Sequence, residues 1–281
     1  PVLLTGETGT GKEVFAQAIH RNSERAKKSF VAVNCAAFSK ELLESEMFGH
    51  KAGSFTGALK DKKGLFEEAN HGTIFLDEIG EMAFDLQAKL LRILETGEFI
   101  KIGDTKPTKV DVRIIAATNR DLEKEIEQGH FREDLFYRLS VFQIHLPALR
   151  ERVEDIPLHI KAFVSAFSSK MGKNIRTISP EYIDALKKRA WKGNVRELRN
   201  AIERSLIIAD GDTLTLDALP LNMQTSSAAS TESYSGFDLS GVEKMHIQKV
   251  LKYTKGNKTE TSRLLGIGLT TLYRKIEEYG L

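Results

Sequence analysis

One short glycine-rich segment constrains the fold more than any other part of the chain. Gly6-Glu7-Thr8-Gly9-Thr10-Gly11-Lys12 follows the apolar run 2–4 and precedes a helix-like stretch at 13–20. This is the context of a phosphate-binding P-loop, whose glycines let backbone N–H groups approach phosphates while the helix N-terminus adds positive potential. An ordinary glycine-rich turn is the alternative, but spacing, strand and helix agree on a P-loop. Lys12 is then expected to reach the β- and γ-phosphates of a nucleotide.

A pair of acids completes the chemistry that a P-loop begins. Asp77 and Glu78 follow the apolar run 73–76, and a buried strand that ends in two acids favours a bound cation over a plain turn. Asp77 would help to hold Mg²⁺ and Glu78 would polarise the attacking water. Glu13 stands where a P-loop usually carries a Ser or Thr magnesium ligand, and its carboxylate is also a hard oxygen ligand. We therefore expect ATP and Mg²⁺ as cofactors.

Three further polar residues fit a nucleotide site. Asn119 ends a third strand signal, where its amide would orient the water or sense the γ-phosphate. Arg132 and Arg138 lie in one segment, and in a ring they would reach the nucleotide of a neighbouring subunit. An arginine supplied in this way accelerates hydrolysis by on the order of 10³ to 10⁵. The structural alternative is that both arginines pair with Glu133 and Asp134 on a solvated face.

The pattern of apolar runs divides the chain into domains. Strand-like runs at 2–4, 30–33, 73–76 and 110–117 alternate with helical stretches such as 13–20 and 86–95. Continuously apolar strands separated by helices are typical of a parallel sheet that is buried on both faces. We predict an α/β P-loop domain over residues 1–148, with a direct start at the first strand that suggests a fragment truncated at its N-terminus.

The next stretch has a helical pattern and no strand signal. Helices are predicted at 156–170, 180–190 and 195–209, which makes residues 149–222 a helical lid subdomain. The last of these helices is expected to begin with Asn194 as N-cap and Glu197 as its reciprocal partner. Its buried stripe would contain Val195, Leu198, Ile202 and Leu206.

A basic module follows a linker. Residues 223–238 are mostly Ser, Thr, Ala and Gly, which is typical of a flexible linker. Residues 239–281 hold eight Lys or Arg against four acids, although the whole chain has a net charge of only +2. A basic terminal module favours a polyanion partner, and a solvated lysine-rich helix face explains the charge equally well.

The order of predicted helices and glycines distinguishes a polyanion-binding module from a solvated lysine-rich helix face. Apolar residues Ile247, Val250 and Leu251 mark a first helix, and Asn257 begins a second helix that ends at Leu265. The turn 266–268 leads into a third helix, so the module resembles an all-α helix-turn-helix domain. A three-helix dimerisation module is the alternative, and dimers are expected in either case. The third helix would bury Leu269, Leu272 and Ile276, and its candidate contacts to double-stranded DNA are Thr270, Thr271, Arg274 and Lys275.

The hexamer Gly53-Ser54-Phe55-Thr56-Gly57-Ala58 places an aromatic residue between two glycines, far from any core pattern. It resembles the GAFTGA loop of the NtrC-like sigma-54 activators and departs from that loop only at Ser54. Further segments agree with the same family: GETGTGKE at 6–13, ESEMFGH at 44–50, FLDEIG at 75–80, FREDLFYRL at 131–139 and WKGNVREL at 191–198. The tail resembles a Fis-type domain through GNKTETSRLLGI and TLYRKIEEYGL. The resemblance covers essentially the whole chain.

This resemblance implies an AAA+ ATPase that assembles from dimers into a ring, usually a hexamer, and remodels the closed complex of sigma-54 RNA polymerase holoenzyme. It makes Arg138 the arginine finger and Arg132 a second contact between subunits. Arg196 becomes the lid arginine that senses nucleotide, and Asn34 the residue that holds Glu78 away from water. Gly53, Ser54, Phe55, Thr56, Gly57 and Ala58 become the sigma-54 contact, with Phe55 and Thr56 at its centre. Competing functions are a DNA-binding repressor or ligand-responsive regulator on the same framework that does not use sigma-54, and a generic remodelling motor.

The single cysteine, Cys35, excludes an internal disulfide framework, and no apolar run approaches the roughly 20 residues that cross a bilayer. Cys35 ends an apolar run, where a small buried residue packs well, so we do not expect it to act as a nucleophile. A cytoplasmic protein is expected, without a membrane partner. The input signal stays open between two-component control through a phosphoacceptor domain and direct control by a ligand.

Overall fold

The structure is a computed structural model that describes residues 1–209, 211–220, 243–244, 246–248, 250–251, 254 and 256–280. The chain divides into two compact units, residues 1–226 and 227–281. The linker predicted at 223–238 lies outside the described residues. Within the described parts, no helix has both the length and the hydropathy to cross a bilayer.

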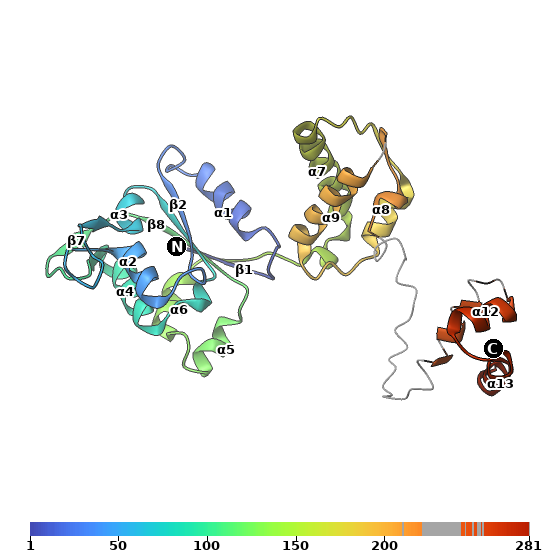
Figure 1. The fold of residues 1–281 in the computed structure, drawn as a ribbon. Coiled ribbons are helices and arrows are strands. Elements are labelled where there is room, and N and C mark those ends of the chain that lie inside the picture. The colour runs from blue at the N-terminus through green and yellow to red at the C-terminus, as the bar shows by residue number, and fades with distance from the viewer. Residues whose placement is uncertain are drawn as a thin grey trace. The chain divides into compact units, whose positions relative to one another are not determined.

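A five-stranded parallel sheet is the centre of the first unit, with the order β2-β5-β8-β1-β9 (Figure 1). The two central strands, β5 and β8, are buried along almost their whole length, as expected for a sheet covered on both faces. The run predicted at 110–117 becomes a strand only from Arg113. The strands are β1 (Val2–Thr5), β2 (Phe30–Asn34), β5 (Thr73–Asp77), β8 (Arg113–Thr118) and β9 (Gln143–His145).

Helices cover both faces of this sheet (Figure 1). Helix α1 (Lys12–Arg21) lies on one face, where Ala16 packs among Val2, Leu4 and Phe75. The larger cluster on the other face is built by residues of α2, α4, α5 and α6, with Leu3 and Ile74 from the sheet. These elements are α2 (Lys40–Phe48), α3 (Leu65–Glu68), α4 (Phe84–Thr96), α5 (Leu122–Glu127), α6 (Glu133–Leu139) and the 3₁₀ turn η1 (Ile79–Glu81).

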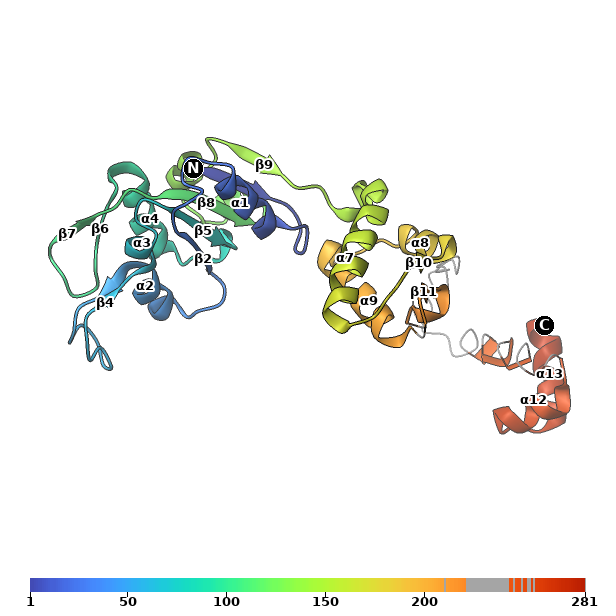
Figure 2. The same ribbon diagram turned by 90° about the horizontal axis from the view of Figure 1, so that it is seen from above.

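Two hairpins project from the same side of the sheet domain, beside α2 and α4 (Figure 2). One joins β3 (Gly49–His50) to β4 (Lys62–Lys63), and the other joins β6 (Glu98–Ile100) to β7 (Pro107–Lys109). A bridge between His50 and Ile102 connects them, with the Lys51 N–H donating to the Ile102 carbonyl at 2.9 Å. The base of the β3–β4 hairpin therefore meets the loop of the β6–β7 hairpin, just beyond the last strand pair, Ile100 with Pro107.

The rest of the first unit is a helical subdomain around buried Trp191 and Tyr182. Its elements are α7 (Ile156–Met171), α8 (Pro180–Lys187), α9 (Asn194–Ile208) and the 3₁₀ turns η2 (Leu149–Glu151), η3 (Val153–Asp155) and η4 (Leu216–Ala218). The expectation of no strand here was wrong, because β10 (Thr177–Ile178) pairs in parallel with β11 (Thr213–Leu214). Two-residue strands leave almost no periodic signal in a sequence, which explains the omission.

The start of α9 also differs from the prediction. Gly193 is the N-cap, and Asn194 is the first helical residue, with a φ of 53° in the left-handed region. Glu197 accepts from the Gly193 N–H at 2.8 Å, so the reciprocal bond is shifted by one residue. The Asn194 side chain makes its hydrogen bonds with other parts of the first unit instead. The predicted stripe is otherwise confirmed, since Leu198, Ile202 and Leu206 are buried and Val195 packs against them.

The second unit contains the predicted helix-turn-helix pair, α12 (Lys258–Leu265) and α13 (Leu269–Tyr279). Asn257 caps α12 by accepting from the Glu260 N–H at 3.2 Å, which confirms the predicted start. The described residues between 243 and 251 are helical, and Ile247 is buried. Leu272 is buried and Ile276 partly so, whereas Leu269 is 40% exposed and was wrongly expected in the core. As the first residue of α13, Leu269 has no preceding turn to pack against.

Candidate active site

A cavity of about 330 Å³ lies where the glycine-rich loop, the end of β5 and helices α7 and α9 meet. The loop lies between β1 and α1, and Gly6, Gly9 and Gly11 have positive φ angles that most side chains would not tolerate. The start of α1, with Gly11, Lys12 and Glu13, lies at the cavity. The lining residues are Thr8, Gly9, Gly11, Lys12, Glu13, Val14, Asp77, Glu78, Phe163, Val195, Arg196 and Arg199.

Lys12 is buried at the centre of the predicted phosphate loop. Its ammonium donates to the carbonyl oxygens of Gly6 at 2.8 Å and Glu7 at 3.4 Å. Burial lowers the pKa of Lys12, and the carboxylates of Glu78 and Asp77 oppose that shift. Thr10 braces the loop through a hydrogen bond of 2.8 Å from its hydroxyl to the Glu7 carbonyl. The amine is thus held where phosphate oxygens would replace the loop carbonyls as its partners.

Glu78, which was predicted to polarise the attacking water, lies together with Asn119 and with Asp77, the predicted Mg²⁺ ligand. Glu78 has a φ of 51°, an uncommon conformation for a glutamate and one that clusters at functional sites. Its Oε2 accepts from the Asn119 N–H at 3.3 Å, and the Asn119 amide donates to Thr8 Oγ1 at 3.0 Å. Asp77 Oδ1 accepts from the Glu78 N–H at 3.1 Å. Asn119 therefore connects the phosphate loop to the residue that would activate water.

Glu13 and Asp77 line the same cavity, as the prediction of a shared magnesium site requires. Glu13 is exposed and accepts from the Gln17 amide at 3.4 Å, so an oxygen is available to a ligand. In the described part of the chain, no three His, Cys, Asp or Glu side chains gather into a metal site. This donor set fits Mg²⁺, which commonly takes one or two carboxylates and completes its shell with phosphate and water oxygens.

Two arginines of the lid line the cavity, and only Arg196 was predicted from the sequence. Arg196 lines it as predicted, and its backbone N–H donates to the Gly9 carbonyl at 3.3 Å. Arg199 also lines the cavity, and its guanidinium lies 5.5 Å from the ring centre of Phe167. Residues three apart share a helix face, so the position of Arg196 was a signal that could have identified Arg199.

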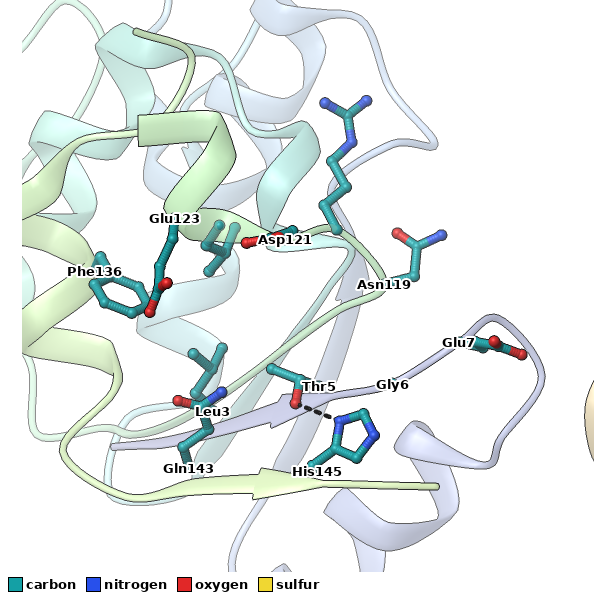
Figure 3. A pocket seen from close by; sticks show the side chains of 12 residues that line it. Leu3, Thr5, Gly6, Glu7, Asn119, Asp121, Glu123, Phe136, Gln143 and His145 are labelled. Atoms are coloured by element: carbon teal, nitrogen blue, oxygen red, sulfur yellow. Dashed lines mark hydrogen bonds between the residues drawn. The ribbon is translucent and has the colours of Figure 1, made fainter. Parts of the chain in front are cut away.

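A second cavity, of about 390 Å³, is lined by the start of the phosphate loop and by residues of β1 and β9 (Figure 3). His145 Nδ1 and Thr5 Oγ1 are 3.2 Å apart at its floor. Asn119 stands at its rim, while the carboxylate of Glu7 is directed away from Thr5 and His145. Glu7, which was expected to bind the cofactor, does not line the lid-side cavity. The two cavities thus flank the beginning of the phosphate loop.

Asn34 ends β2 next to the end of β5, and Cys35 follows it. Asn34 pairs in register with Asp77, but its Oδ1 accepts from the Ala36 N–H at 2.8 Å within its own turn. Its contact with Glu78 therefore stays a prediction that requires this turn to change. Burial raises the pKa of the Cys35 thiol to about 12, with the Asp77 and Glu78 charges adding to the shift. Such a thiol stays protonated and is not a nucleophile.

The two candidate trans arginines have different surroundings. Arg132 forms a forked ion pair with Asp134, with N–O distances of 3.0 and 2.7 Å, as the structural alternative anticipated. Arg138 lies exposed in the last turn of α6, and its side chain has no hydrogen-bond or ion-pair partner among the described residues. The structure therefore leaves Arg138 available to a neighbour, whereas Arg132 must first leave Asp134.

The segment 53–58 forms the tip of the β3–β4 hairpin. A 2.7 Å ion pair between Lys51 and Asp61 closes its base, and the Gly53 N–H donates to the Ala58 carbonyl at 2.8 Å. Phe55 is 46% exposed, and its ring forms a T-shaped pair with the His50 ring at a centroid distance of 4.9 Å. Ser54, the departure from the GAFTGA pattern, has a buried hydroxyl without a partner among the described residues. An exposed aromatic on a closed loop is typical of a binding surface.

A parallel sheet of this strand order, a phosphate loop after β1, acids at the end of β5 and a helical lid together define an AAA+ module. Comparison with known families identifies it further. Residues 1–145 match the sigma-54 interaction domain, residues 150–235 the AAA+ ATPase lid domain, and residues 239–279 the bacterial regulatory protein, Fis family. The chain belongs to the sigma-54 interaction domain family.

Individual relatives agree with this membership. The regulatory protein AtoC of Escherichia coli is 48% identical over an alignment of 288 positions, which covers 100% of this chain and 62% of AtoC. The nitrogen fixation protein AnfA of Azotobacter vinelandii is 48% identical, across 100% of this chain and 53% of AnfA. The crystal structure of NtrX from Brucella abortus in complex with ATP is 37% identical, with a TM-score of 0.74 over 100% of this chain and 64% of NtrX. The chain thus spans between half and two thirds of the length of these relatives.

Proposed function

We propose that this protein hydrolyses ATP with Mg²⁺ in an oligomeric ring and uses the energy to remodel the closed complex of sigma-54 RNA polymerase. Its second unit would bind enhancer-like DNA, which places the protein in the cytoplasm. The observation that carries the proposal is that the chain has both a cavity lined by the predicted catalytic residues Asp77 and Glu78 and an exposed Phe55 on a separate hairpin. A repressor that does not use sigma-54 needs neither feature.

Nucleotide binding is supported by the fit of the cavity to a polyphosphate. Lys12, Arg196 and Arg199 supply positive charge around backbone N–H groups at the start of α1. When Mg²⁺ is bound, it would neutralise charge on the transferring phosphate, with Asp77 and Glu13 as its protein ligands. Glu78 would take the proton of the attacking water. NtrX crystals with ADP and with ATP show that similar proteins bind these nucleotides.

Assembly into a ring is supported by the surroundings of Arg138. Tyr137, Val141 and Phe142, which flank it in sequence, are 65%, 70% and 60% exposed. Three large apolar side chains around an unpaired arginine are typical of a surface that a partner covers. We infer that a neighbouring subunit packs here, so that Arg138 enters the neighbour's nucleotide cavity. Arg132 would be a second contact across the same interface.

The variant Phe55→Ala tests the sigma-54 part of the proposal. It should keep ATP hydrolysis and DNA binding, because Phe55 does not line the nucleotide cavity. It should fail to open sigma-54 promoters, since an aromatic anchor commonly contributes roughly 2 kcal/mol or more at an interface. Open-complex formation with sigma-54 polymerase and steady-state hydrolysis are measured on the same preparation.

Leu59→Ala is the matched control, because Leu59 lies on the same loop, is 89% exposed and lies outside the hexamer 53–58. It should retain promoter opening. Full opening by Phe55→Ala would remove Phe55 from the sigma-54 contact. A wild-type chain that binds DNA and hydrolyses ATP but opens no promoter would favour the repressor function instead.

The DNA-binding surface is proposed to centre on Thr270 and Arg274. Both are exposed and four residues apart, so they share one face of α13. Thr271 is half-buried, so less of its side chain would be able to contact DNA. Lys275 is occupied within the unit, because its ammonium pairs with Glu243 at 2.5 Å, and that carboxylate also accepts from the Tyr279 hydroxyl. Lys275 therefore holds the fold of the unit, and its contact with DNA stays a prediction.

Replacing Arg274 with alanine should weaken DNA binding by about 1–3 kcal/mol, as expected for an arginine that reads a base edge. Arg263→Ala is the control, since Arg263 already forms a forked pair with Glu260 through N–O distances of 3.1 and 2.7 Å. Affinity is measured by fluorescence anisotropy at several salt concentrations. Equal effects of the two substitutions would mean that α13 does not enter the groove.

A further inference from the structure

Glu7 contacts the lid from within the phosphate loop. Its carboxylate accepts two hydrogen bonds from the Arg150 guanidinium, at 2.8 and 2.7 Å, and one from the Asn194 amide at 3.1 Å. Both donors belong to the lid subdomain, and Asn194 is 187 residues from Glu7 in sequence. We call these three residues the Glu7 clamp. The carboxylate points away from the floor of the second cavity (Figure 3).

The geometry of the Glu7 clamp separates it from an ordinary surface ion pair. Arg150 and Glu7 are each 45% exposed, and exposed pairs usually stabilise little. Here the pair is forked and is extended by Asn194, which is completely buried. The hydrogen bonds from Arg150 and then Asn194 lower the pKa of Glu7 from 4.5 to about 2. The contact is therefore complete above pH 4.5 and is lost only as the pH falls toward about 2.

Asn194 transmits this contact to the nucleotide cavity. Its Oδ1 accepts from the Leu149 N–H at 2.8 Å, and its amide also donates to the Thr8 carbonyl at 3.0 Å. It is the first residue of α9 and precedes Arg196 by two positions, so its orientation sets where that helix begins. Its amide nitrogen is thus committed to the contact with the phosphate loop, while its Oδ1 holds Leu149 within the lid.

The backbones of loop and lid also touch. A Cβ atom added to Gly9 would lie 2.3 Å from the Gly193 carbonyl oxygen, so no side chain fits between them. Two hydrogen bonds accompany this approach, from the Arg196 N–H to the Gly9 carbonyl and from Arg152 Nη2 to the Thr10 carbonyl. These contacts require the lid to keep one orientation on the phosphate loop.

We propose that Glu7 is a positioning residue, which fixes the lid on the phosphate loop through Arg150 and Asn194 and so places Arg196 and Arg199 over the nucleotide. The proposal rests on the nucleotide-binding part of the proposed function. Without the Glu7 clamp, the lid samples other orientations, and a nucleotide must select the docked one before it binds. Loss of the clamp therefore weakens ADP and ATP binding alike.

Two measurements on Glu7→Ala test the proposal. The dissociation constant for a fluorescent ADP analogue should rise about tenfold, within the usual range of coupling between sites. Without nucleotide, the amides of Arg196 and Leu149 should exchange hydrogen faster, because Arg196 donates to Gly9 across the contact between lid and loop and Leu149 donates to Asn194, whose side chain the clamp holds in place. Amides of the buried strand β5 should keep their protection. Glu154→Ala is the control, since Glu154 is a lid carboxylate with a 92% exposed side chain.

A substitution in the lid tests the same contact while leaving the phosphate loop unchanged. Arg150→Ala should reproduce both effects, and the double variant Glu7→Ala with Arg150→Ala should be no worse than either single one. Glu7→Gln, which keeps an acceptor but loses the charge, should be intermediate. If Glu7→Ala does not fold, Arg150→Ala alone decides the outcome.

Unchanged exchange at Leu149 and Arg196, or additive effects of the two alanine substitutions, would overturn the proposal. A wild-type chain that binds no nucleotide would instead disprove the proposed function. The exchange measurement without nucleotide would still decide whether Glu7 holds the lid, so the two failures can be told apart.

Discussion

Glu78→Gln should bind ATP with nearly wild-type affinity and lose hydrolysis by roughly 10²- to 10⁴-fold, the usual contribution of a positioned general base. Glutamine keeps the size of the side chain and retains an oxygen that accepts from the Asn119 N–H, a bond of 3.3 Å in the wild type. Its amide cannot take a proton from water at neutral pH. The expected result is therefore a chain that assembles and binds nucleotide but does not turn it over.

Binding of a fluorescent ATP analogue and steady-state phosphate release measure the two halves of this prediction. Glu95→Gln is the matched control, because Glu95 is an exposed residue of α4 outside the nucleotide cavity. It should behave as wild type in both assays. Wild-type turnover by Glu78→Gln would show that another group activates the water. A variant that no longer binds ATP would show that Glu78 supports the cavity instead.

Arg138→Ala should lower ATP hydrolysis by on the order of 10³-fold at concentrations where rings form, because an arginine from a neighbour stabilises charge in the transition state. Arg138 has no side-chain partner among the described residues, so its loss leaves no unpaired group in its own subunit. Arg21→Ala is the matched control, an exposed arginine in the last turn of α1. Ring formation is checked by light scattering on each preparation.

Mixing Arg138→Ala with Glu78→Gln distinguishes a site shared between subunits from one within a subunit. Each variant is inactive alone, but a mixed ring contains interfaces that combine an intact Glu78 with an intact Arg138 of the neighbour. In a random equal mixture about a quarter of the interfaces of a head-to-tail ring are of this kind. Turnover should therefore partly return. Verified mixed rings that stay inactive would place the arginine finger elsewhere, with Arg132 as the next candidate.

Much of the fold and the candidate site follows from local sequence. Val2–Thr5, Thr73–Asp77 and their neighbours form buried strands because apolar runs of that length can be satisfied only inside a covered sheet. Parallel strands end at the same edge, which brings Asp77 and Asn119 to the loop that carries Lys12. These predictions needed only the apolar runs, the polar residues that end the strands and the spacing of the glycines.

The errors occur where a side chain is used by a distant part of the chain. Asn194 was expected to cap its own helix, yet its amide joins Leu149, Thr8 and Glu7. Capping rules describe neighbours in sequence, whereas a buried amide takes the partners that the packed subdomains offer. The ion pair of Arg132 with Asp134 was an alternative that the sequence left open, and the structure shows that pair.

The sequence by itself determined the chemistry of this protein: a phosphate loop, paired acids, an exposed aromatic hexamer and a helix-turn-helix. Each depends on residues within a few positions of one another, so a linear pattern contains the information. Only the tertiary structure decided how these parts are joined. It directed the Glu7 carboxylate to the lid, placed Arg199 at the cavity and packed Phe55 against His50. Such contacts depend on the packing of segments far apart in the chain, and no local pattern specifies which of several polar side chains will meet.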